Sequence, residues 1–121
     1  MLPKTRKGCW QLGCAGQILL PRIRVADSFA LRGVGLMGRR RMPEAYGAGL
    51  FFPKCRSLHG CFMRFDLEVW FLDAAGQPVG EPQLLKPWRV VVGPRQAVHC
   101  MEVLPGLVMR GEGEFVWSAE G

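Results

Sequence analysis

The sequence contains no long apolar run. No stretch approaches the roughly 18 consecutive apolar residues that a membrane-spanning helix needs. The basic N-terminal residues are not followed by the apolar segment of a secretory signal. These absences predict a cytoplasmic protein with no membrane span, and export stays open only if the start of translation was assigned too far downstream.

The chain contains five cysteines and two histidines. An odd number of cysteines cannot pair completely within one chain, so we expect reduced thiols in the predicted compartment. The segment Cys55-x3-His59-x-Cys61 carries residue types that bind zinc. Its spacing matches no common zinc module, so we favour free thiols and predict no metal site and no cofactor.

The signatures of common enzymes are also missing. The chain has neither a G-x-x-x-x-G-K-[ST] phosphate loop nor a G-x-S-x-G nucleophile turn. Its only serines are Ser28, Ser57 and Ser118, so serine hydrolase chemistry is poorly supplied. We therefore assign no catalytic residue.

Glycine and proline are abundant, at 16 and 9 of the 121 residues. Many short strands joined by turns use these residues more often than helices do, and the length suits one domain. We predict a loosely ordered arm or an edge strand over residues 1–16 and a single mainly β domain over 17–121. The expected architecture is a β-sandwich or small barrel of about seven short strands, with one short N-terminal helix.

The helix is predicted from a change of apolar spacing. Leu31, Val34 and Met37 recur at every third position, which is typical of a helix over about 28–38. Before it, residues 17–25 favour a strand, and Pro21 indicates an edge position. After it, short apolar runs predict strands at 49–52, 62–63, 67–72, 78–85, 88–92, 96–103 and 114–117. The run at 67–72 is apolar on both faces, as in a central strand covered on both sides.

Several segments of the chain resemble sequence motifs of the family known as domain of unknown function 192, and they occur in the same order as in that family. They are Arg32-x-x-Gly35-Leu36-Met37-x-Arg39, Gly49-Leu50-Phe51-Phe52, His59-x3-Met63-Arg64-Phe65, Val69-x-Phe71-Leu72-Asp73, Pro87-Trp88-Arg89 and Met101-Glu102-Val103. The family usually has an aspartate where this chain has Glu68. The resemblance implies a mainly β, sandwich-like fold with a short helix, and it implies no established activity or cofactor.

One set of polar residues stands out within the matched, otherwise apolar segments. The set comprises Arg32, His59, Arg64, Glu68, Arg89 and Glu102. One interpretation is a buried ion-pair network that fixes the helix against the sheet. The other is a cleft whose arginines bind a polar or anionic ligand, with His59 and Glu68 tuning it.

Three classes of function follow from these features. We favour a non-catalytic module that binds a small ligand or a protein, since β-sandwiches host many such functions. A hydrolytic or metal-dependent enzyme is the second class, and it requires His59 close to Glu68 or Glu102. The net charge of +6 and the run Arg39–Arg41 suggest a nucleic-acid-binding domain as the third. Aromatics beside arginine, as in Trp88-Arg89, support it only if they are exposed, and we expect strand aromatics to lie in the core.

Overall fold

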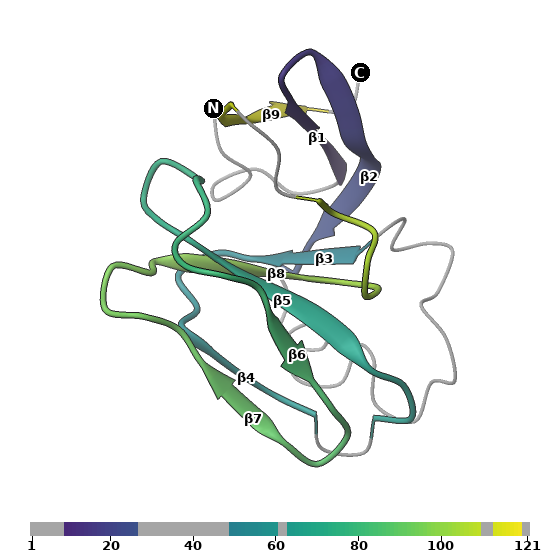
Figure 1. Ribbon diagram of the computed structural model, residues 1–121, viewed down its shortest axis with the longest axis vertical. Coiled ribbons are helices and arrows are strands. Elements are labelled where there is room, and N and C mark those ends of the chain that lie inside the picture. The colour runs from purple at the N-terminus through teal and green to yellow at the C-terminus, as the bar shows by residue number, and fades with distance from the viewer. Residues whose placement is uncertain (1–8, 27–48, 61–62, 110–112, 120–121) are drawn as a thin grey trace.

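The computed structural model describes residues 9–26, 49–60, 63–109 and 113–119, and this part of the chain contains nine strands and no helix. The strands are β1 (Cys9–Cys14), β2 (Gln17–Val25), β3 (Gly49–Phe52), β4 (Ser57–His59), β5 (Leu67–Leu72), β6 (Gln83–Leu85), β7 (Val90–Val92), β8 (His99–Val103) and β9 (Phe115–Ala119). Seven of them form one sheet in the order β6-β5-β8-β3-β2-β1-β9, and β4 pairs with β7 in a second sheet (Figure 1). Among the strands of the described ranges, only β2 and β3 pair in parallel.

Strands β3, β8 and β5 form a central layer that is buried on both faces. The register pairs Trp70 with Met101 and Phe71 with Cys100. Because successive side chains of a strand point to opposite faces, Trp70 and Met101 lie in one apolar core, whereas Phe71 and Cys100 lie in the other. The molecule therefore has a core on each side of this layer.

The first core lies between the central layer and the β2-β1-β9 end of the large sheet. The ring of Phe51 meets Trp117 edge-on at 5.1 Å between centroids, and Trp70 lies 5.8 Å from Phe115. The side-chain amide of Gln77 donates to the carbonyl oxygen of Phe115 at 2.8 Å and accepts from its N–H at 2.7 Å. Burial of the large aromatic rings supplies most of the stabilising energy of this first core.

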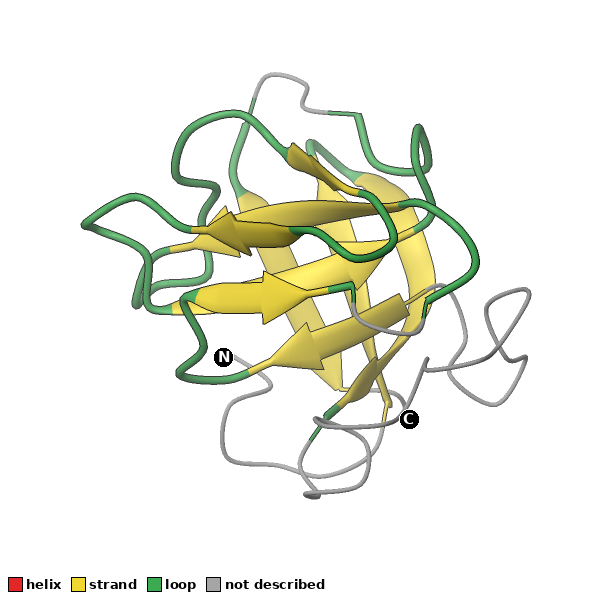
Figure 2. Ribbon diagram, turned by 90° about the horizontal axis from the view of Figure 1, so that it is seen from below, coloured by secondary structure: helices red, strands yellow, loops and turns green. Residues whose placement is uncertain are grey.

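The second core lies between the other face of the central layer and the small β4–β7 sheet. Leu58 and Val91 are paired across the small sheet and buried against residues that include Val69 and Phe71. A Cβ atom at Gly93 would stand 2.5 Å from the Phe71 ring, so glycine allows this close approach. Strands of both sheets form the centre of the molecule, with loops around them (Figure 2).

The prediction of a mainly β fold is confirmed, and β3 and β5 occupy the predicted residues. Strand β5 is covered on both sides, as expected from its apolar sequence. The helix predicted for 28–38 lies outside the described residues. Of the strand predicted for 62–63, Met63 is buried but is not in a strand. No helix in the described ranges is long and apolar enough to cross a membrane.

Two expectations near the N-terminus need correction. Residues 9–14, which we placed in a loose arm or an edge strand, form β1, an interior strand that pairs with both β2 and β9. Strand β2 is not an edge strand, because β1 and β3 flank it. Pro21 is tolerated because the β1–β2 register shifts beside it, between the pairs Trp10–Ile23 and Leu12–Leu20. At such a bulge, proline is not required to donate a ladder hydrogen bond.

Candidate functional site

The small β4–β7 sheet has one buried face and one exposed face. Leu58 and Val91 point into the second core, whereas Val90 and Val92 are 64% and 63% exposed. The register pairs Val90 with the exposed His59, so these two side chains share the outward face. Exposed valines next to each other are unusual enough on a small domain to suggest a contact surface.

A strained turn leads into β7. The N–H of Arg89 donates to the carbonyl oxygen of Lys86 at 3.1 Å, which closes a turn with Pro87 and Trp88 at its centre. Trp88 has a φ of 65°, and proline followed by a residue with positive φ matches a type II turn, whose third position normally holds glycine. A non-glycine residue in this region costs about 1–3 kcal/mol. The Trp88 side chain is nevertheless 63% exposed, so core packing does not explain its presence.

Gly60 holds this turn against β4. The N–H of Trp88 donates to the carbonyl oxygen of Gly60 at 2.7 Å. In return, the N–H of Gly60 donates to the carbonyl oxygen of Arg89 at 2.8 Å. A Cβ atom at position 60 would lie 2.5 Å from the carbonyl oxygen of Lys86. Only glycine therefore lets the strand and the turn come this close.

The loop that leads into β4 is anchored on a buried histidine. Lys54 has a φ of 53°, and its N–H donates to Nδ1 of His99 at 2.9 Å. The His99 ring is buried and lies 5.6 Å from the ring of Phe51. Because Nδ1 accepts a hydrogen bond, we assign the proton of the neutral ring to Nε2. This anchor fixes where Lys54 and the following residues enter the small sheet.

Cationic side chains surround the small sheet. We call residues 54–60 and 86–95 the basic ribbon. Its charged residues are Lys54, Arg56, Lys86, Arg89 and Arg95, all of them exposed. It contains no aspartate or glutamate, and no salt bridge joins these five to an acidic residue in the described part of the chain. The basic ribbon therefore presents uncompensated positive charge.

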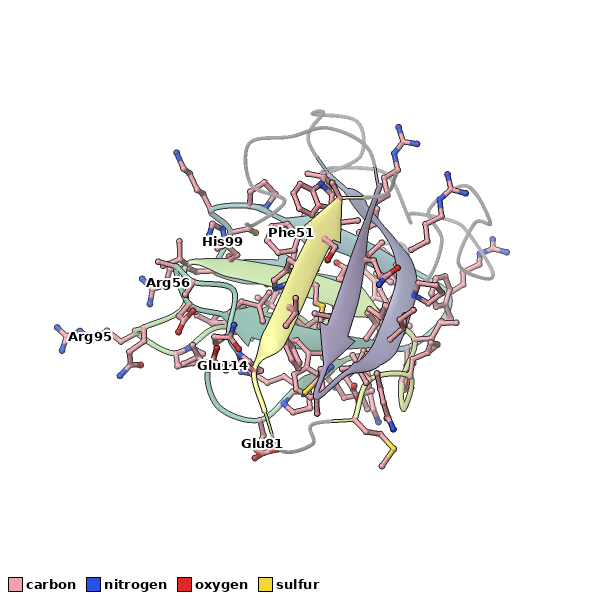
Figure 3. All side chains as sticks on the ribbon, turned by 90° about the horizontal axis from the view of Figure 1, so that it is seen from above. Phe51, Arg56, Glu81, Arg95, His99 and Glu114 are labelled. Carbon is pink, nitrogen blue, oxygen red and sulfur yellow. The ribbon has the colours of Figure 1, made fainter. Side chains whose placement is uncertain are left out.

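Two of these arginines lie together at one end of the ribbon. The Arg56 guanidinium donates to the carbonyl oxygen of Pro94 at 3.2 Å, beside Arg95, and the Gly93 N–H donates to the Arg56 carbonyl oxygen at 2.7 Å. Arg56 and Arg95 lie on the same side of the molecule in Figure 3.

A buried carboxyl group lies on the face of the central layer that packs against the small β4–β7 sheet. Glu102 is 4% exposed and pairs with Leu50 and Val69 on the neighbouring strands. Burial, and secondarily the negative charge of Cys55, raises the pKa of Glu102 from 4.5 to about 8. The group is therefore mostly protonated at neutral pH, and no cation among the described residues pairs with it. This agrees with the high cost of burying an isolated carboxylate.

The six polar residues singled out in the sequence are not all brought together. Glu68 pairs with Val103 and accepts a hydrogen bond from the Trp70 indole N–H at 2.8 Å, on the face of the first core. Glu102 lies on the opposite face. His59 and Arg89 are exposed in the basic ribbon, Arg64 is exposed outside it, and Arg32 lies outside the described residues.

The metal-binding alternative involves Cys55, His59 and Cys61. Cys55 is a half-buried cysteine whose Sγ donates to the carbonyl oxygen of Ser57 at 3.1 Å, and His59 is exposed. Cys61 falls outside the described ranges. The geometry of the three together stays untested.

The residue that sequence reasoning placed wrongly is Trp88. We expected the aromatic of Trp88-Arg89 to be core, but it is exposed. The preceding Pro87 could have predicted this exposure. Proline favours the second position of a turn, which places the next residue in the turn and not in the strand. The exposed Val90 and Val92 could not be recognised, because an apolar run does not reveal which face of a strand is covered.

The fold and this surface define a small, mainly β domain with exposed cations around its small sheet. The chain belongs to the DUF192 family, whose model, described as "Uncharacterized ACR", matches residues 13–112. UPF0127 proteins of Pyrococcus horikoshii and Pyrococcus furiosus are each 34% identical over 94 residues, which is 77% of this chain and 81% and 80% of theirs. No solved structure gives a significant match. Neither the family nor these relatives carry a specific function in their names.

Proposed function

We propose that the protein is a non-catalytic binding module that takes an anionic ligand on the basic ribbon. The observation that carries the proposal is the exposure of five cations on two adjoining segments that contain no acidic residue. Such a field attracts anions and speeds their association. The partner of such a module is either a protein, not yet identified, or a small polar or anionic ligand.

The experiment removes two ribbon charges and compares them with two charges elsewhere. Lys86→Gln/Arg89→Gln should weaken binding of fluorescein-labelled poly-L-glutamate about tenfold at low salt, since close ionic contacts contribute of this order. Arg22→Gln/Arg64→Gln changes the net charge equally at exposed sites outside the ribbon and should change affinity less than about twofold. Fluorescence anisotropy measures both.

Two results would refute the proposal. Equal loss in the two double variants would mean that only net charge matters and that the ribbon is not a site. Absence of poly-L-glutamate binding by the wild-type protein at low salt would remove the anionic ligand altogether.

A further inference from the structure

Resting on this proposed function, we infer that the ligand of the basic ribbon is an acidic polypeptide segment that also carries apolar side chains. The ribbon presents apolar surface in addition to charge. Trp88, Val90 and Val92 are 63%, 64% and 63% exposed, within five residues of chain. Exposed apolar groups framed by cations match a partner in which apolar and acidic residues alternate or adjoin.

The turn indicates that the position of Trp88 matters for more than the fold. Glycine would adopt the positive φ of 65° at this position without backbone strain. Trp88 is retained in a strained backbone while its ring stays largely in solvent. Strain of this kind is typical of binding sites, and tryptophan and arginine are both among the residues enriched in protein-binding hot spots. Arg89 follows Trp88 directly.

The remaining surface favours a polypeptide over a nucleic acid. Single strands stack successive bases on several aromatic rings. In the described part of the chain, Trp88 is the only exposed residue among tryptophan, tyrosine and phenylalanine. Val90 and Val92 offer no planar face to a base, but branched aliphatic side chains pack well against the side chains of a peptide. The five cations of the basic ribbon pair with the acidic residues of that peptide.

The test compares three labelled probes on the wild-type protein: a random Glu/Tyr copolymer, poly-L-glutamate and single-stranded oligo-dT. We expect the copolymer to bind about tenfold more tightly than poly-L-glutamate, and oligo-dT to bind no more tightly than poly-L-glutamate. Equal affinity for the copolymer and poly-L-glutamate overturns the inference and leaves the anionic module standing. Oligo-dT as the tightest probe also overturns it, in favour of nucleic acid. Failure of all three probes refutes the proposed function as well.

Variants then assign the preference to the apolar residues. Val90→Thr/Val92→Thr keeps the shape and the strand preference of both residues and should abolish the preference for the copolymer without changing the affinity for poly-L-glutamate. Ile18→Thr/Val116→Thr is the matched control. Its two residues are 60% and 58% exposed and flank Gly13 on the β2-β1-β9 end of the sheet. A loss of preference in this control, or none in the ribbon variant, would overturn the assignment.

Trp88→Gly separates the contact from the fold. Relief of the left-handed backbone should raise the midpoint of thermal unfolding by about 4 °C, while the preference for the copolymer falls about tenfold. Ala15→Gly removes a similar strain, at a φ of 51° in the β1–β2 turn. It should raise the midpoint and leave binding unchanged. A Trp88→Gly protein that still prefers the copolymer would contradict the inference.

Discussion

Glu102→Gln is expected to remove the largest pH-dependent change in the stability of this protein. The folded state raises the pKa of Glu102 from 4.5 to about 8, mainly through burial. Between these pH values the folded state retains a proton that the unfolded state releases, so the free energy of unfolding falls as the pH rises and levels off above about 8. Each pH unit in this window costs about 1.4 kcal/mol, and the whole window is on the order of 5 kcal/mol.

Glutamine cannot release the proton, so the variant escapes this loss. The free energy of unfolding of Glu102→Gln, relative to wild type, should increase steadily from pH 5 to pH 8. Urea unfolding at four pH values measures it. Glu114→Gln, which replaces an exposed carboxylate, is the control and should follow the wild-type profile. Parallel profiles for Glu102→Gln and wild type would show that the carboxyl group does not titrate in a buried environment.

Gly49→Ala is the second substitution with a large expected effect. Gly49 begins β3 opposite Val103, and a Cβ atom there would overlap the carbonyl oxygen of Glu102 on β8. Since the obstacle is backbone in the central layer, it cannot move aside as a side chain would. We expect a loss of about 3 kcal/mol or more in the free energy of unfolding, at the upper end for overpacked interiors.

Gly13→Ala is a matched control for this effect. Gly13 also lies within a strand of the large sheet, and the nearest atom to its Cβ would be the carbonyl oxygen of Gln17 at 3.2 Å. A small adjustment suffices there, so the loss should stay below about 1 kcal/mol. Equal urea midpoints for the two variants would mean that β3 and β8 do not approach as closely as described.

The sequence was sufficient to predict the strands whose burial is visible in their composition. Residues of β5 are apolar on both faces, and the following Asp73 and Gly76 mark a turn, so its bounds and its covered position could both be predicted. Strand β1 was predicted only as an alternative to a loose arm, because glycine and cysteine interrupt its pattern. Its pairing with β9 comes from a distant segment, and tertiary pairing of this kind overrides weak local preference.

The candidate site was harder to predict because it depends on register. Glu68 and Glu102 look alike in the sequence, as acids within apolar strands. The pairing Glu68–Val103 and Val69–Glu102 places them on opposite faces of the sheet, and a shift of one residue would exchange those faces. The exposure of Trp88 likewise depends on the turn that Gly60 stabilises from a distant strand.

The most direct test of the basic ribbon as a binding surface is a titration of isotope-labelled protein with a short synthetic Glu/Tyr peptide, followed by amide chemical shifts. We predict shift changes concentrated in residues 54–60 and 86–95, together with the indole N–H of Trp88. The indole signals of Trp10, Trp70 and Trp117, which are buried, should stay in place. Changes centred on the exposed β2-β1-β9 surface, or spread evenly over all exposed cations, would contradict this account.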